Sequence, residues 1–454
     1  MKNQEEFIFR YRPTKSFNKY NELQNQEIYF GALGELNDPM EGYKNIFWKG
    51  DKILWRNLLK RYIRCLQKFF CKEEKDEYSF KEYKYLAYLS DQDFTTESFN
   101  KICEIFFAIP SVEKFLTLLE QQENMFREEL IFCLEFLHQQ LLKIINFITL
   151  GDHKITQDML NEMDSTVTKL NEYLSLKLSE EYKKIFKKIQ IEKFLKSADS
   201  LHFTFMIVNA ELIQTITEHL KYKKDLSIGF PKHYIDSLEE LMYPEYYIAS
   251  FTKDCTNPSM WSHYAENHQG ICLKFKPAVL NNQLSIPNIG ILQKVNYTKG
   301  YPKIDFFRSL GRHTGPELIQ QWYTDDNGNT SSVYNECFGK NEDNWRKNYW
   351  KKSNDSLLIK FKEWKYEEEY RIIISGSLEQ SIDEKKRLFK YKFENLDGII
   401  FGAMTSEENI LKIAKIIQNN SKVAHRDYKS FNFYRAHYDN FNKKMEIKKF
   451  ITDW

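Results

Sequence analysis

The sequence predicts an α+β protein in which a split, mixed β-sheet core carries a large inserted α-helical bundle. Short runs rich in aromatic and β-branched residues, which are typical of strands, occur near both ends of the chain. Residues from about 51 to 240 instead carry apolar side chains at helical spacing between Lys and Glu. One core interrupted by an insertion explains this pattern better than two tandem domains. We therefore divide the chain into 1–48 (first part of the core), 49–245 (helical insertion) and 246–454 (remainder of the core).

The individual elements are predicted from the local periodicity of apolar residues and from the turn-forming residues between them. The expected strands span 7–11, 27–31, 247–252, 270–275, 292–297, 397–402, 431–437 and 443–450, and residues 363–374 are a turn that runs into a strand. The expected helices span 18–25, 53–70, 113–149, 159–177, 181–194, 260–264, 355–362 and 407–418, the last of them behind a Ser406 cap. Residues 201–208 fit either a strand or a buried helical turn, and residues 301–351 have loop composition around 325–329.

Bulk composition excludes some classes of protein. Lys and Arg number 66 against 64 Asp and Glu, so the formal charge of +2 supplies no overall field for nucleic acid or an anionic membrane. The 7 Cys show no C-x-x-C pair and no disulfide-like spacing, which indicates reduced thiols and a cytoplasmic protein. The first residues lack an apolar signal segment, and no apolar run of membrane-spanning length is free of charge, so we expect no membrane association.

Three polar clusters lie on expected strands or at their ends. The first is Arg10, Tyr11 and Arg12 in the opening strand, and the second is the pair Ser250 and Thr252, whose alternation places both hydroxyls on one face. The third contains Glu367, Glu369 and Arg371, which we expect to share one face of a strand. Like charges this close raise a pKa, which is typical of a functional site, although Glu–Arg pairing at an exposed strand end explains the same pattern.

Two further segments supply candidate cleft residues. Asn37, Asp38 and Glu41 surround Pro39; this is turn chemistry, yet three polar side chains at one corner also suit a cleft. In the short helix 260–264, Trp261 and Tyr264 either pin the helix to the sheet or line the site, and His263 is an acid/base candidate.

Four motifs occur in a recognisable order. They are Asn37-Asp38-Pro39-x-Glu41, then Met260-Trp261-x-x-Tyr264, then Trp364-x-x-Glu367-x-Glu369-Tyr370-Arg371, and finally Ile399-Ile400-Phe401-Gly402. Together they resemble a bacterial family of domains of unknown function that is marked by N-D-P-x-E, M-W-x-x-Y and W-x-x-E-x-E-Y-R. The likeness covers residues 7–48 and 246–450 and leaves out the helical block. It implies no activity.

The order Arg, Ser-x-Thr, Glu-x-Glu, each on a strand, is similar to the R-S-E arrangement of ADP-ribosyltransferases. That resemblance implies NAD as substrate, with Arg10 on its phosphates and Ser250 and Thr252 supporting the pocket. It implies that Glu369 stabilises the oxocarbenium-like centre as nicotinamide leaves and that Glu367 orients the acceptor. Tyr11, Trp261 or Tyr264 would contact the cofactor, and the acceptor would be a protein or a nucleic acid.

Two other classes of function stay open. A metal-dependent nuclease would use the Glu363-x-Lys365 spacing with Asp355 or Asp38, although such a pair arises by chance in a chain this rich in Glu and Lys. A zinc site at His263 and His268 fails on spacing, and we expect no metal. The remaining alternative is a sensor that binds a nucleotide or a protein without catalysis. The insertion would then gate the cleft, sense a trigger or form a homo-oligomer, and orphan bacterial families of this kind often act in phage defence or bacterial conflict.

Overall fold

The computed structural model describes residues 6–15, 20–71, 96–150, 155–179, 229–298, 300–310, 321–376 and 382–450. The expected helix at 181–194 and the ambiguous segment 201–208 lie outside these residues. The described chain confirms the α+β class and forms two compact units. Unit 1 comprises 1–44, 244–302 and 352–454, and unit 2 comprises 45–243 and 303–351.

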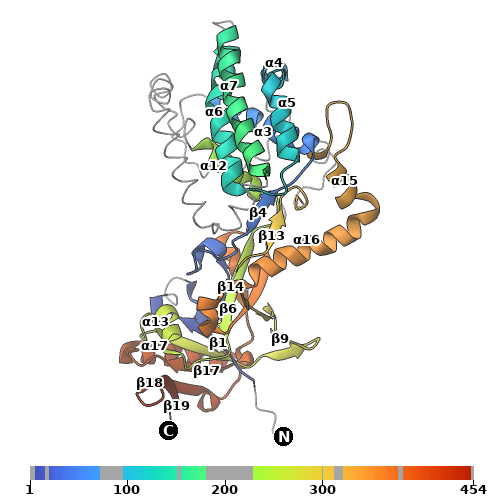
Figure 1. Ribbon diagram of the computed structural model, residues 1–454. Coiled ribbons are helices and arrows are strands. Elements are labelled where there is room, and N and C mark those ends of the chain that lie inside the picture. The colour runs from blue at the N-terminus through green and yellow to red at the C-terminus, as the bar shows by residue number, and fades with distance from the viewer. Residues whose placement is uncertain are drawn as a thin grey trace. The chain divides into compact units, whose positions relative to one another are not determined.

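Unit 1 is built around a sheet of nine strands among the described residues, in the order β11-β15-β6-β1-β7-β17-β18-β19 with β3 also paired to β6 (Figure 1). Its strands are β1 (Ile8–Arg12), β3 (Gly31–Ala32), β6 (Tyr246–Thr252), β7 (Ile271–Phe275), β11 (Gln293–Lys294), β15 (Glu369–Ser375), β17 (Leu396–Phe401), β18 (Asn432–Asp439) and β19 (Lys444–Lys449). Strands from the two ends of the chain are therefore hydrogen-bonded neighbours, as the split core predicts.

Each face of this sheet buries an apolar cluster. Helix α17 (Glu407–Val423) places Ile413 and Ile417 in one cluster, and the Ser406 hydroxyl accepts from Asn409 N to cap the helix as predicted. Helix α13 (Pro258–Tyr264) adds Met260 and Trp261 to the other cluster. The turn after α13 requires Gly270, because a Cβ there would lie 2.4 Å from the Arg12 carbonyl oxygen.

Smaller elements complete unit 1. They are α2 (Glu22–Asn25), β2 (Glu27–Tyr29) paired with β16 (Leu388–Lys390), the meander β8 (Ala278–Leu280), β9 (Gln283–Ile286) and β10 (Gly290–Ile291), and β12 (Asn296–Thr298) paired with β14 (Ile359–Phe361). The prediction of a helix over 355–362 is wrong at its end. Helix α16 (Glu342–Leu357) stops at Leu357, and the next residues form β14.

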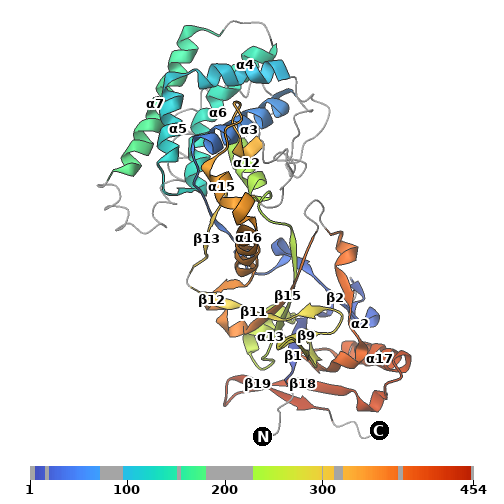
Figure 2. The ribbon, with the colours of Figure 1, turned by 90° about the vertical axis from the view of Figure 1, so that its right-hand side faces the viewer.

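Unit 2 is a helical bundle with a small sheet (Figure 2). Its helices are α3 (Lys52–Cys71), α4 (Thr96–Phe107), α5 (Pro110–Glu120), α6 (Arg127–Leu150), α7 (Gln157–Leu178), α12 (Phe230–Glu239), α15 (Ser332–Cys337) and the first ten residues of α16, and its strands are β4 (Asn45–Trp48), β5 (Met125–Phe126) and β13 (Lys303–Asp305). Because β4 pairs with both β5 and β13, the expected helix 113–149 is interrupted, and residues 303–351 cluster with the bundle.

Helix α6 is long and apolar enough to cross a membrane by length and composition. It is the single such helix in the described part of the chain, and 56% of its apolar window is buried inside the protein. Burial of this kind is also found in the core helix of a helical bundle.

Candidate functional site

A cavity of about 500 Å³ lies in unit 1 at neighbouring strands of the large sheet. Strands β15, β6 and β1 are adjacent, and their register places Glu369 opposite Thr252 and Arg371 opposite Ser250. Arg10 on β1 reaches across to the Ser250 carbonyl oxygen at 3.1 Å. The volume falls within the range of ligand pockets, roughly 300–1,000 Å³. The three clusters predicted from sequence therefore meet at one cavity.

One part of the lining is a buried cluster of carboxylates and cations. Arg371 forms a bidentate pair with Glu369, with Nε to Oε1 at 2.9 Å and Nη2 to Oε2 at 2.8 Å. Lys360 Nζ lies 2.7 Å from Glu367 Oε2 and 3.2 Å from Glu369 Oε2. Glu41 completes the cluster, with Oε1 at 2.6 Å from Arg371 Nη1 and Oε2 at 3.5 Å from Lys360 Nζ. The five side chains are between 0% and 6% exposed, so their charges are screened little by water.

Glu367 reaches this cluster by a route that strand periodicity does not predict. It ends a 3₁₀ helix (Lys362–Glu367), and Glu368 then adopts a left-handed conformation with φ of 45° before β15 begins at Glu369. The expectation that Glu367 and Glu369 share a strand face is therefore wrong in its geometry. Both carboxylates nevertheless reach Lys360, with Glu367 Oε2 at 2.7 Å and Glu369 Oε2 at 3.2 Å from its Nζ.

Tyrosine side chains hold the acidic cluster in place. The Tyr264 hydroxyl donates to Glu367 Oε1 at 2.5 Å, and the Tyr297 hydroxyl accepts from Glu369 N at 2.9 Å. Tyr301 donates to the Met40 carbonyl oxygen at 3.1 Å, beside Glu41. Burial, together with the charge of Glu367, raises the pKa of Tyr264, so its hydroxyl remains a proton donor at neutral pH.

The charges of the cluster do not cancel. Three carboxylates against one lysine and one arginine leave a formal excess of one negative charge when all are ionised. Burial raises the pKa of Glu367 and of Glu41 despite the nearby cations. Burial acts on Glu369 in the same direction, but the charges of Arg371 and Lys360 outweigh it and hold its pKa at about 2. The cluster therefore presents a permanently ionised carboxylate beside one that takes up a proton more readily than usual.

A second part of the lining is cationic and aromatic. Burial, with the charge of Arg12 adding to it, lowers the pKa of Arg10 to about 9, so its guanidinium stays protonated at neutral pH; its Nη2 donates to the Tyr29 carbonyl oxygen at 2.8 Å. Arg12 pairs with Glu22, yet its Nε is buried and has no hydrogen-bond partner within the described chain. Tyr20 stacks on Tyr29 with ring centroids 4.5 Å apart. This part of the cavity suits an anionic group next to a flat ring.

Most of the candidate residues taken from the sequence line the cavity. These are Arg10, Tyr11, Asn37, Glu41, Ser250, Thr252, His263, Tyr264, Glu367 and Glu369. The exposed His263 also meets Tyr366, with Nδ1 3.1 Å from the hydroxyl oxygen.

Three candidates take other positions. Trp261 is fully buried, packs edge-on against Tyr11 at 5.0 Å and donates to the Cys255 carbonyl oxygen, so its ring has no exposed face for a ligand. Asp38 is buried and its side chain accepts a hydrogen bond from Met40 N. It therefore stabilises the turn that Pro39 predicts. Arg371 is 0% exposed and acts on the site through Glu369.

Lys360 is the central residue that sequence reasoning missed. It lies in β14 between the half-buried Ile359 and Phe361, and the local pattern gives no signal that the lysine faces inward. The sequence predicts a helix over 355–362, and a lysine at the end of a helix is ordinarily a solvated side chain. The pairing of β14 with β12 turns Lys360 inward, where it is 5% exposed.

The residues proposed for a nuclease do not assemble. Glu363, Lys365 and Asp355 are exposed, and none of them lines the cavity. Among the described residues, no group of three His, Cys, Asp or Glu side chains is arranged to hold a metal ion. Glu41, Glu367 and Glu369 come together, but Lys360 and Arg371 already occupy the space between them.

The fold and the site define an α+β protein with a ligand-sized cavity lined by buried charged groups. Residues 260–372 match the model of a family described as "Protein of unknown function (DUF2971)". The matched segment begins in α13 and ends in β15, and it contains Tyr264, Lys360, Glu367, Glu369 and Arg371. The match supports the expected likeness to a family of domains of unknown function. Neither a curated protein nor a solved structure matches the chain.

Proposed function

We propose that the cavity binds NAD as a substrate and that the protein transfers the ADP-ribosyl group to a protein or nucleic-acid acceptor. The observation that carries this proposal is the convergence of Arg10, Ser250 and Glu369 on one cavity from three adjacent strands. The R-S-E resemblance implies this arrangement. The short motifs alone do not bring these residues together, because more than three hundred residues separate β1 from β15 along the chain.

The charge distribution supports a ligand that is itself polarised. NAD carries an anionic pyrophosphate and a cationic nicotinamide ring. Arg10 and the unpartnered Nε of Arg12 suit the pyrophosphate. The acidic cluster, with its excess negative charge, suits the positive end.

The same charges favour the reaction over simple binding. Transfer breaks the bond between C1′ of the ribose and the nicotinamide nitrogen; nicotinamide leaves with the bonding pair, and positive charge develops at C1′. Glu369, ionised and fixed by Arg371, stabilises that charge without reorganising. A nucleophilic acceptor then bonds to C1′ and gives up its proton. Glu367 takes this proton, because its raised pKa makes it a better base than an ordinary carboxylate.

Incubation of the purified protein with NAD labelled in the adenylate phosphate, with and without a cell lysate, tests the proposal. We expect release of nicotinamide and label on an acceptor, and loss of both in Glu369→Gln and Glu367→Gln. Glu363→Gln is the matched control, since it makes the same change at an exposed carboxylate in the same 3₁₀ segment. Absence of nicotinamide release and of an NAD-induced thermal shift would remove the proposal.

A binding function is the second candidate, and the heavy pairing of Glu369 favours it. Both oxygens of Glu369 accept from Arg371, and Oε2 also accepts from Lys360. Few lone pairs are then left for a substrate hydroxyl. An NAD-induced thermal shift without turnover would select the sensor. A role in phage defence or bacterial conflict rests on the family resemblance, and loss of protection in cells carrying Glu369→Gln would support it.

A further inference from the structure

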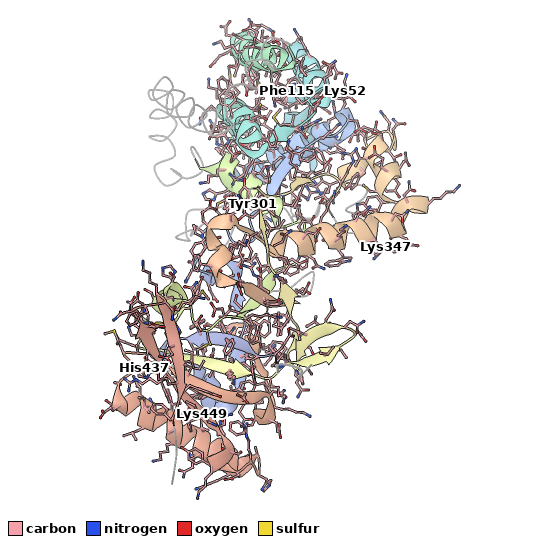
Figure 3. All side chains as sticks on the ribbon, turned by 60° about the horizontal axis from the view of Figure 1, so that its bottom comes forward. Lys52, Phe115, Tyr301, Lys347, His437 and Lys449 are labelled. Atoms are coloured by element: carbon pink, nitrogen blue, oxygen red, sulfur yellow. The ribbon has the colours of Figure 1, made fainter. Side chains whose placement is uncertain are left out.

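The C-terminal ribbon, which we define as β18, β19 and the turn between them (residues 432–449), forms one edge of the large sheet. Strand β19 pairs with β18 from Tyr434 opposite Lys449 to Asp439 opposite Lys444. Among the described residues no further strand pairs with β19, although Met445 N on its outer side donates to the Thr256 carbonyl oxygen at 2.8 Å. Figure 3 shows the side chains of the ribbon, with His437 and Lys449 labelled.

The ribbon is basic although the chain as a whole is nearly neutral. It contains five cationic side chains against two carboxylates: Arg435, Lys443, Lys444, Lys448 and Lys449 against Asp439 and Glu446. All four lysines are exposed. The local excess of three positive charges exceeds the +2 of the entire chain. A concentration of this kind attracts a polyanion.

The tip of the ribbon presents an aromatic side chain on a rigid turn. Phe441 is 97% exposed and Tyr438 is 55% exposed. Asp439 holds the turn, since its Oδ1 accepts from Phe441 N at 2.9 Å and its Oδ2 accepts from Asn442 Nδ2 at 2.7 Å. These bonds lower the pKa of Asp439, so the turn is held throughout the neutral range. The backbone that carries Phe441 is therefore held in a defined turn.

We propose that the C-terminal ribbon binds nucleic acid, with its lysines on backbone phosphates and Phe441 stacked on a base. Cations next to exposed aromatic side chains are the elements of single-strand recognition. A two-stranded ribbon also fits the major groove of a duplex. None of the ribbon residues lines the cavity.

The distribution of charge favours a nucleic acid over a membrane. Lys444 near the tip and Lys448 toward the far end share one face of β19, about 14 Å apart at roughly 3.4 Å per residue. A polyanion that runs along this face meets both, whereas a membrane reached by Phe441 meets only the lysines near the tip. Lysines on an edge strand also prevent pairing between sheets. That role does not require an exposed phenylalanine.

Fluorescence anisotropy with the full chain tests the proposal, using a 20-nucleotide single strand and a 20-base-pair duplex as probes. Contacts from Lys443, Lys444 and Lys448 to about three phosphates would give log K a slope of about −2 against log[salt] on a single strand, or a roughly 20-fold loss of affinity between 50 and 200 mM salt. Lys444→Gln/Lys448→Gln should reduce that slope by about 1.4. Phe441→Ala should weaken single-strand binding roughly 5- to 100-fold and leave the slope unchanged.

The matched control is Lys415→Gln/Lys422→Gln, which removes two exposed lysines from α17 of the same unit. It should leave affinity and slope as in the parent protein. All five substituted positions are exposed, so thermal unfolding should be unaltered. Three results would overturn the proposal: no binding of either probe at 50 mM salt, an equal effect of the ribbon and control variants, or binding of vesicles containing anionic phospholipid with none of nucleic acid.

Discussion

Replacement of Glu369 by Gln removes one charge from the buried cluster with almost no change in shape. Arg371 loses a bidentate partner but keeps Glu41, and Lys360 keeps Glu367. Breaking a buried ion pair costs about 3–5 kcal/mol, and the retained partners favour the lower end. The pKa gives a similar figure. A fall from the ordinary 4.5 to about 2 corresponds to about 3 kcal/mol of stability.

The pH dependence of this stability has a definite sign. The folded pKa of Glu369 lies below the unfolded value, so its contribution is complete above about pH 4.5. This contribution to stability is lost as the pH falls from 4.5 toward 2, because in that range Glu369 binds a proton in the unfolded chain but not in the folded one. The difference between parent and Glu369→Gln should therefore be about 3 kcal/mol at pH 7 and should shrink steadily below pH 4.5.

A urea titration followed by hydrogen exchange of β6 and β15 amides measures this difference. Exchange in these strands reports unit 1 alone, which matters because a chain with two compact units does not have to unfold in a single step. Glu363→Gln, at an exposed position, should match the parent within about 0.5 kcal/mol. A difference for Glu369→Gln below 1 kcal/mol at pH 7, or one that is the same at pH 3 and pH 7, would refute the reasoning.

Three further predictions concern the same unit. Lys360→Met should lower the free energy of unfolding by about 3–5 kcal/mol at pH 7 and by less at pH 4.5, because the carboxylates it leaves unpaired can then be protonated. In the same urea assay, adding Glu367→Gln should restore part of the lost stability. Additive losses from the two substitutions would contradict the Lys360–Glu367 pairing. In the transfer assay, the rate should rise with pH as Glu367 loses its proton, at a pH above 4.5 because the pKa of Glu367 is raised. Glu367→Gln should lower the rate roughly 100-fold or more and abolish this rise with pH. Trp261→Phe should lower stability by about 2 kcal/mol while NAD affinity, measured by calorimetry, stays within twofold; a larger change in affinity would mean that the ring contacts the ligand.

Local pattern was a reliable guide where an element depends on its own residues. Strand β6 was expected over 247–252 and spans Tyr246–Thr252, and α17 begins behind Ser406 as its cap predicts. Local sequence pattern gives the wrong secondary structure where pairing with a distant strand determines it. Residues 359–361 continue a helical pattern in sequence but form β14, because β12 supplies their hydrogen bonds. Residues 125–126 likewise leave the helical pattern to pair with β4.

Local sequence pattern is enough to predict the α+β class, most of the strands and the residue types that gather at the cavity. These follow from periodicity and side-chain chemistry, which act within a few residues of the chain. Long-range packing brings Glu41 and Lys360 to Glu369 and brings Tyr264 to Glu367. It also makes Glu367 arrive through a left-handed turn and makes Trp261 a buried support. Strand register between segments hundreds of residues apart sets these contacts, and register depends on which partners bury each other's surface. A single sequence carries no local signal of that choice.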